Sequence, residues 1–253
     1  MLLTNPRPSQ KTVGTYYQST NYISHTSAAN GIIDYIYLIF RRLTLLWKLR
    51  LIKPYLKENL LLDVGCGTGN FLNHCKHAGV DIYGVEPSPE ARIIAARHNL
   101  NIVEKMDQLP PFKFNVITLW HVLEHIYDLS GTIQELKNRL AENGIIFIAV
   151  PNWQSFDSVH YKEIWAGYDV PRHVWHFSKT TMGLLLKNAG LEIKEIIPMK
   201  LDAYYVSLLS EKYAVSGSLS LSHIINAITL GYRSNRKGRR EMNYSSLIYL
   251  VQK

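Results

Sequence analysis

Short apolar runs alternate with amphipathic stretches along most of the chain. Five runs have the length and composition of buried strands: Leu60–Val64, Asp81–Val85, Asn101–Glu104, Asn115–Trp120 and Gly144–Val150. Stretches with apolar residues at three- and four-residue spacing follow the first two runs, as expected of amphipathic helices. Because strands that alternate with helices usually form parallel pairs, the pattern predicts an α/β fold with helices on both faces of the sheet.

The N-terminal part of the chain departs from this alternation. Residues 1–30 are polar, and we expect them to form a loose arm. Apolar residues at helical spacing then lie between Lys and Arg residues from Ile32 to about Leu56, which predicts one or two basic amphipathic helices. Such helices could lie on an anionic membrane, although a solvated helical cap over the rest of the protein is the simpler expectation.

The C-terminal part predicts two further strands, Leu191–Ile197 and Ser246–Val251. Residues 202–243 lie between them, and their apolar spacing predicts helical stretches. This insertion also carries the basic tract Arg233–Arg240, which we expect to be an exposed loop.

The composition narrows the class of protein. The chain has 253 residues, 47% of them hydrophobic, and its 28 basic and 20 acidic residues give a net charge of +8. This charge favours an anionic partner without distinguishing a cofactor, a lipid headgroup or a nucleic acid. The only two cysteines, Cys66 and Cys75, predict neither a disulfide framework nor a zinc ribbon. With no signal-peptide pattern at the N-terminus, we expect a soluble, cytoplasmic protein.

A glycine-rich turn follows the first predicted strand. The sequence Leu-Leu-Asp-Val-Gly-Cys-Gly-Thr-Gly ends with Gly65, Gly67 and Gly69 at alternate positions, directly before a predicted helix. Such a turn brings backbone N–H groups and a helix N-terminus close to a ligand. Two acids follow at the ends of the next strands, Glu86 after the second and Asp107 after the third. The arrangement predicts a nucleotide-like cofactor.

Asp63-Val-Gly-Cys-Gly-Thr-Gly, Glu86 and Asp107, in this order and spacing, resemble class I S-adenosylmethionine-dependent methyltransferases, and more broadly the group of ubiquinone-biosynthesis-type O-methyltransferases. The resemblance implies that Asp63 and the glycine backbone hold the methionine part of the cofactor, Glu86 the ribose and Asp107 the adenine. The full set of expected cofactor contacts is Asp63, Gly65, Cys66, Gly67, Gly69, Glu86, Asp107 and His121.

The resemblance also makes the expected fold more specific. It implies a doubly wound, mostly parallel, seven-stranded sheet of the Rossmann-like methyltransferase type. We expect an N-terminal arm and helical cap over residues 1–56, and a methyltransferase domain over 57–253 that includes the helical and basic insertion at 202–243.

A histidine-rich segment, Trp120-His121-Val-Leu-Glu124-His125, follows the fourth predicted strand and resembles the Leu-Glu-His signature of the same group. On a helix, His121, Glu124 and His125 would share one face. Three interpretations stay open: a divalent-metal site, a metal-free polar lining in which His121 or His125 acts as a base, and a structural role. Some relatives have a glutamate where this chain has His121, so the resemblance does not carry the metal site over.

A second polar segment runs from Trp165 to Ser178 and resembles the Pro-Arg-His…His-Phe-Ser segment of that group. Arg172 could bind an anionic acceptor, and His173, or with less support His176, could remove a proton from it. Packing of the loop by its aromatic residues is the alternative. The candidate catalytic residues are therefore His121, His125, Arg172 and His173.

The expected function is transfer of a methyl group from S-adenosylmethionine to a small molecule, most simply to a hydroxyl oxygen. Two alternatives stay open: a nucleic-acid (RNA) methyltransferase that uses the basic surface, and a non-catalytic S-adenosylmethionine-binding protein. The motif that usually accompanies base methylation is absent after the fourth strand, where Leu119–Val122 stand, and this argues against the first alternative.

Overall fold

The computed structural model describes residues 1–17, 32–215 and 219–253, and for residues 32–41 it describes only the backbone. Seven strands form one sheet in the order β4-β3-β2-β5-β6-β9-β8. Their bounds are β2 (Leu60–Val64), β3 (Asp81–Val85), β4 (Ile102–Val103), β5 (Phe114–Trp120), β6 (Leu140–Pro151), β8 (Glu192–Pro198) and β9 (Ser246–Gln252). The predicted seven-stranded, mostly parallel sheet is confirmed.

In the sequence, one described α-helix precedes these strands and the others lie between them. Their bounds are α2 (Ile32–Ile52), α3 (Asn70–His77), α4 (Pro89–Ala96), α5 (Leu129–Arg139), α6 (Phe156–Tyr161), α7 (Lys179–Asn188), α8 (Asp202–Ala214) and α9 (Leu221–Glu241). Within the described ranges, none of the helices has the length and apolar composition that a membrane span requires.

The chain forms two compact units, which we describe separately. The glycine-loop unit comprises residues 14–122, 130–148 and 251–253, and the helical-insertion unit comprises residues 1–13, 123–129 and 149–250. The division into a cap over 1–56 and a domain over 57–253 stays a prediction.

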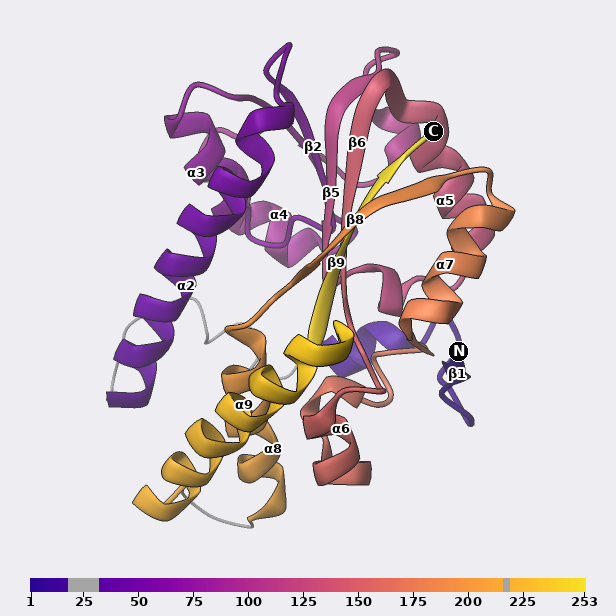
Figure 1. Ribbon diagram of the computed structural model, residues 1–253. Coiled ribbons are helices and arrows are strands. Elements are labelled where there is room, and N and C mark those ends of the chain that lie inside the picture. The colour runs from indigo at the N-terminus through magenta and orange to yellow at the C-terminus, as the bar shows by residue number, and fades with distance from the viewer. Residues whose placement is uncertain (18–31, 216–218) are drawn as a thin grey trace. The chain divides into compact units, whose positions relative to one another are not determined.

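In the glycine-loop unit, β2 pairs in parallel with β3 on one side and with β5 on the other. Leu62 lies opposite Tyr83 and Ile117 in these ladders, and the interior of β2 is buried. Strands buried on both faces are typically continuous apolar runs, which is why β2 and β5 are recognisable in the sequence. Helix α3 packs on β3, and α2 packs on α3 (Figure 1).

The helical-insertion unit contains α8 and α9, which lie side by side (Figure 1). The buried carboxylate of Asp157 on α6 connects three parts of this unit. It accepts hydrogen bonds from Trp165 Nε1 at 2.8 Å, from Ser234 Oγ on α9 at 2.6 Å and from Ser245 Oγ at 2.6 Å. These bonds compensate the carboxylate for its loss of hydration and hold α9 against the rest of the unit.

Two local expectations were wrong. The basic tract Arg233–Arg240 is the C-terminal part of α9 and not a loop, because small residues on its inner face allow it to pack as a helix. The first residues of the arm are also ordered: β1 (Leu2–Leu3) pairs with β7 (Trp175–His176) in antiparallel fashion. The arm continues through residues 18–30, which lie outside the described part of the chain.

Candidate functional site

The loop after β2 presents its backbone to open space. Gly65 and Cys66 both donate their N–H groups to the carbonyl oxygen of Val85, at 2.7 and 3.1 Å, so the loop lies at the carboxyl end of β3. Gly67 has φ +55°, a conformation that favours glycine, and no heavy atom of the described residues lies within 4 Å of where its Cβ would stand. A ligand can therefore approach this backbone directly.

Glu86 holds the glycine loop from the end of β3. Its Oε2 accepts a hydrogen bond from the Gly67 N–H at 2.8 Å, and its Oε1 accepts one from the Ser88 N–H at 2.8 Å. Each carboxylate oxygen has a further lone pair, so both can also accept from the two hydroxyls of a ribose. The carboxylate thus fixes the loop conformation and keeps acceptors for the ribose contact that the sequence predicts.

Asp63 lies at the carboxyl end of β2 and is buried. Its Oδ1 accepts a hydrogen bond from Thr118 Oγ1 at 2.6 Å. Burial raises the pKa of this carboxyl to about 7, although the Thr118 hydrogen bond and the positive charge of Lys48 act in the opposite direction. A carboxyl group with such a pKa changes its charge near neutral pH and pairs well with a cationic ligand group.

Cys66 and Gly69 are oriented differently within the loop. A Cβ on Gly84 of β3 would stand 2.8 Å from the Cys66 sulfur, so the thiol packs against the strand. Burial raises the pKa of this thiol above its ordinary range. Gly69 has φ +75° and precedes the first residue of α3. Cys66 can therefore serve a ligand only through its backbone, and Gly69 through the start of the helix.

Lys48, a residue of this unit, was not among the candidates of the sequence analysis. The Lys48 ammonium on α2 lies 4.4 Å from the ring centroid of Trp120, at the carboxyl end of β5, and Phe71 meets the same ring edge-on. In the sequence, Lys48 is one of several basic residues on the predicted cap helix. No local signal separates it from its neighbours, since its position beside Trp120 depends on how α2 packs.

Asp107 lies in a 3₁₀ turn, Met106–Gln108, after β4, and its side chain is exposed. The turn is anchored by Arg139, which donates to the carbonyl oxygens of Met106 and Pro110 at 2.8 and 2.7 Å. An exposed acid on an anchored turn can accept from a ligand amine, and its contact with adenine stays a prediction.

The helix expected after β5 is absent. His121 has φ +57° and lies in a bend, and only Leu123–His125 form a single 3₁₀ turn before α5 begins. The helical face that would have brought His121 together with Glu124 and His125 therefore does not form. The positive φ at His121 ends the regular backbone directly after the strand, which the apolar pattern did not reveal.

Within the helical-insertion unit, Glu124 and His125 lie beside His173. One potential ligand atom from each residue lies within 4.8 Å of those of the other two. The His125 and His173 rings meet edge to face with centroids 4.5 Å apart, and His173 Nε2 is 3.9 Å from Glu124 Oε1 and 3.7 Å from Asp169 Oδ2. Two imidazoles thus share a buried acidic environment, and the set also offers donor types that divalent metals accept.

Backbone carbonyls determine the tautomers of these two histidines. His125 Nδ1 is 3.1 Å from the Arg172 carbonyl oxygen, and His173 Nδ1 is 3.0 Å from the Gly167 carbonyl oxygen. Because a carbonyl oxygen only accepts, each Nδ1 carries the proton and donates it. In the neutral form, each Nε2 therefore has a lone pair and can accept a proton or bind a cation.

The side chain of Arg172 binds an acidic residue in the same loop. Its guanidinium forms a hydrogen-bonded ion pair with Asp169, three residues earlier. Burial raises the pKa of Asp169, while the ion pair with Arg172 acts to lower it. An anionic acceptor would therefore have to compete with Asp169 for this guanidinium.

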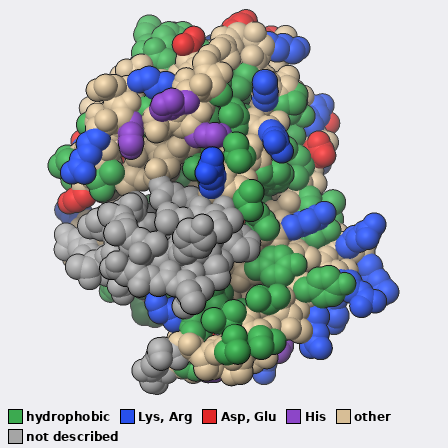
Figure 2. Space-filling view, turned by 90° about the vertical axis from the view of Figure 1, so that its left-hand side faces the viewer, with side chains coloured by type: hydrophobic (Ala, Val, Ile, Leu, Met, Phe, Trp, Pro, Cys, Tyr) green, Lys and Arg blue, Asp and Glu red, His purple; other side chains and the backbone are tan. Residues whose placement is uncertain are grey.

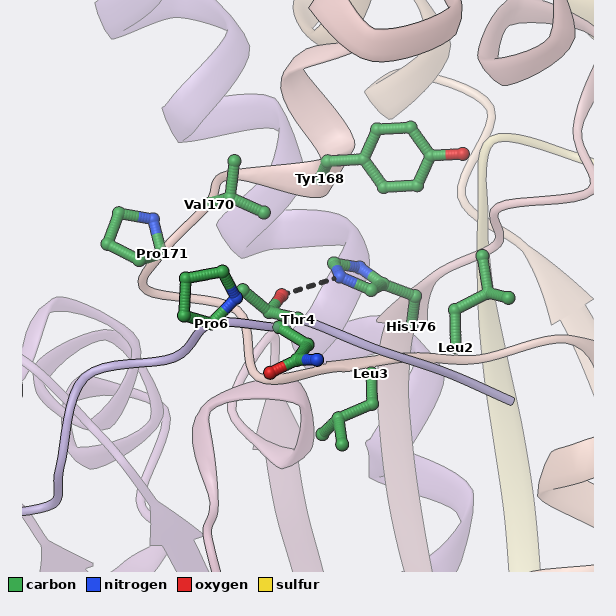
Figure 3. A pocket seen from close by; sticks show the side chains of 9 residues that line it. Leu2, Leu3, Thr4, Pro6, Tyr168, Val170, Pro171 and His176 are labelled. Carbon is green, nitrogen blue, oxygen red and sulfur yellow. Dashed lines mark hydrogen bonds between the residues drawn. The ribbon is translucent and has the colours of Figure 1, made fainter.

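His176 has a different role from the other two histidines. Thr4 Oγ1 donates to the His173 carbonyl oxygen at 2.7 Å, so its oxygen accepts from His176 Nε2 at 3.0 Å (Figure 3). Burial lowers the pKa of His176 to about 4, so it is neutral at physiological pH and its Nε2 proton is donated to Thr4. His176 thus connects the N-terminal strand to β7 and is poorly suited to act as a base.

A shallow hollow of about 580 Å³ lies over this contact, and Figure 3 shows the side chains around it. It is mostly apolar, and its lining includes Leu2, Leu3, Pro6, Tyr168 and Val170. Much of this lining comes from the segment that the sequence analysis treats as a loose arm. The N-terminal segment has few apolar residues, and they show no strand or helix periodicity over a longer stretch. The hollow therefore becomes visible only through the pairing of β1 with β7.

Comparisons with known proteins identify the family. Residues 34–196 match the family model described as "Methyltransferase domain". The chain is 27% identical over 197 residues to the ubiquinone biosynthesis O-methyltransferase of Pelagibacter ubique (strain HTCC1062). This alignment covers 72% of this chain and 80% of that protein. The protein of the same name from Pseudomonas paraeruginosa (strain DSM 24068 / PA7) is 24% identical over 182 residues, or 65% of this chain and 76% of that protein.

Solved structures share the fold at lower sequence identity. The magnesium protoporphyrin IX methyltransferase of Synechocystis PCC 6803 with bound SAH superposes with a TM-score of 0.62 at 14% identity, over 96% of this chain and 99% of that one. A SAM dependent methyltransferase from Archaeoglobus fulgidus superposes with a TM-score of 0.55 at 19% identity, over 84% of this chain and 94% of that one. The family match spans more than half of the chain, which therefore belongs to the methyltransferase-domain family and is an S-adenosylmethionine-dependent methyltransferase.

Proposed function

We propose that this methyltransferase methylates a hydroxyl oxygen of a small molecule. The observation that carries the proposal is the pair of imidazoles, His125 and His173, which lie beside Glu124 with each Nδ1 bonded to a backbone carbonyl oxygen. A hydroxyl is a weak nucleophile until a base takes its proton, whereas a neutral amine already carries a nucleophilic lone pair. The relatives named ubiquinone biosynthesis O-methyltransferase support an oxygen acceptor.

For the cofactor, we infer a division of contacts over the glycine-loop unit. Asp63 would pair with the ammonium of the methionine part, the Gly65 and Gly67 backbone would line the same part, and Glu86 would accept from the ribose hydroxyls. Open space in front of Gly67 and the spare lone pairs of Glu86 fit this assignment. The bound cofactor supplies a methyl group already activated by a sulfonium.

The proton acceptor in this proposal is His125. Its ring is only half-buried and so can reach a substrate, whereas His173 is buried. When His125 takes the proton, the nearby Glu124 carboxylate stabilises the imidazolium. His173 then positions the His125 ring through their edge-to-face contact. Arg172 keeps its partner Asp169 and orients the loop.

The test is transfer of a labelled methyl group to a panel of phenols, alcohols and amines of matched size, with and without a chelator. We expect transfer to a hydroxyl compound that is insensitive to the chelator. In His125→Gln, kcat should fall by about a hundredfold or more, the usual contribution of a general base, with binding of S-adenosylhomocysteine unchanged. Methylation of amines alone, or full activity of His125→Gln, would refute the proposal.

A further inference from the structure

Helix α9 has one face that is fixed inside its own unit. Ser234 Oγ on this face donates to the buried Asp157 at 2.6 Å. A Cβ on Gly231 would stand 2.6 Å from Cδ1 of Tyr204, so α8 and α9 are in close contact there. The buried residues of the helix are Ala227, Leu230, Gly231, Ser234 and Gly238. Through this face α9 is already packed into its unit. The stability of the helix therefore does not require its other faces to be buried.

A second face of α9 is apolar and exposed. Leu221, Ile225, Ile228 and Tyr232 have exposed fractions of 72, 54, 56 and 58%. Their spacing of four, three and four residues places them in one stripe along the helix. Single exposed apolar residues are ordinary on a protein surface, but four aligned along three turns of one helix indicate a contact surface.

The segment that carries this stripe is basic. From Lys212 to Arg240 the sequence contains no Asp or Glu, and the C-terminal half of α9 carries Arg233, Arg236, Lys237, Arg239 and Arg240. Arg239 continues the line of the stripe, because it follows Tyr232 by seven residues. In Figure 2, the lowest part of the view, where α8 ends and α9 begins (Figure 1), shows hydrophobic side chains with Lys and Arg side chains close by. Cations at a helix C-terminus stabilise the helix dipole, but that role needs no apolar stripe.

We propose that this outer face of α9, the stripe and its flanking arginines, binds the surface of an anionic lipid bilayer. The helix would lie in the plane of the membrane, with the stripe among the acyl chains and the arginines at the headgroups. Charge complementarity selects this occupant: a symmetric contact with a second copy would bring two acid-free, basic segments together. A nucleic acid would pair with the arginines and would leave the four apolar side chains without a partner.

The test is co-sedimentation of the full-length protein with vesicles of phosphatidylcholine, with and without phosphatidylglycerol. The stripe variant is Ile225→Ser/Ile228→Ser. Its matched control, Ile93→Ser/Leu184→Ser, removes the same kind of side chain from exposed positions on α4 and α7 (64 and 57% exposed). A charge variant, Arg236→Gln/Arg239→Gln, tests the headgroup contacts. Binding of S-adenosylhomocysteine and circular dichroism show whether each variant is folded.

We expect the wild type to bind only the anionic vesicles. The stripe variant should lose at least about tenfold in affinity, since two half-exposed isoleucines no longer enter the apolar layer. The charge variant should lose about tenfold or more, and binding should weaken with salt. The control should bind like the wild type. No binding of the wild type, equal loss in the control, a dimer that only the stripe variant dissociates, or RNA binding that depends on the arginines alone would overturn the proposal.

Discussion

The carboxyl group of Asp63 should make cofactor binding depend on pH. Its raised pKa, about 7, means that at pH 5.5 only about 3% of the molecules carry the ionised form, against about half at pH 7. If the ionised form is the one that pairs with the ligand ammonium, the affinity for S-adenosylhomocysteine rises more than about tenfold between these pH values. Binding at low pH should also release a proton.

The same raised pKa has a defined effect on stability without ligand. The pKa of this carboxyl is 3.8 when unperturbed and about 7 in the folded protein, so the unfolded chain loses the proton first as pH rises. The contribution of Asp63 to the free energy of unfolding is therefore most favourable below about pH 4 and decreases up to about pH 7. The total change is on the order of 4 kcal/mol, because each tenfold change in an ionisation constant corresponds to about 1.36 kcal/mol.

Calorimetric titration at pH 5.5 and 7, in two buffers of different ionisation enthalpy, measures the affinity and the proton release. Denaturant unfolding over the same range measures the stability. Asp63→Asn keeps the size of the side chain, should abolish the pH dependence of binding and should remove the contribution of Asp63 to the pH dependence of stability. Thr118→Val removes the hydrogen bond that favours the carboxylate and should move the binding transition to higher pH. Equal affinity of the wild type at the two pH values, or the same pH dependence of affinity in Asp63→Asn, would refute the reasoning.

Three further predictions concern single contacts. Glu86→Ala removes the acceptor of two backbone N–H groups, and calorimetry should show that S-adenosylhomocysteine binds about tenfold or more weakly. An unchanged affinity would show that Glu86 does not contact the cofactor. Gly84→Ala would place a Cβ 2.8 Å from the Cys66 sulfur, and urea denaturation should show a loss of about 1–3 kcal/mol; a neutral effect would mean that the loop shifts freely. Asp157→Ala leaves three donors, including Trp165 Nε1, without their acceptor. Urea denaturation should show that the free energy of unfolding falls by at least about 3 kcal/mol, and a smaller loss would contradict a central role for this carboxylate.

Much of the glycine loop and its surroundings was predictable because the signals are local. The run Leu60–Val64 has to be a strand buried on both faces, and glycines that follow at alternate positions allow backbone with positive φ. Glu86 follows β3 directly, so the parallel pairing of β2 with β3 brings it to the edge where the loop begins. Neighbouring parallel strands end at the same edge of a sheet. The order of the motifs along the chain therefore predicted that Glu86 lies beside the glycine loop.

The histidine cluster shows where that reasoning ends. His121 is close to Glu124 in sequence, yet the helix that would have aligned them does not form. His173 comes from a distant loop and joins Glu124 and His125 only through the fold. The useful tautomer of His125 depends on the carbonyl of Arg172, a contact that no local pattern specifies.

The sequence by itself determined the sheet, the glycine loop and the cofactor class, because strand periodicity, positive φ and the spacing of acids after strands are properties of short segments. Only the tertiary structure decided which histidines gather around Glu124, how strongly burial raises the pKa of Asp63, and that the apolar stripe of α9 remains outside the core. Each of these depends on distances between residues far apart in the chain and on the water that packing excludes. A sequence pattern specifies neither of them.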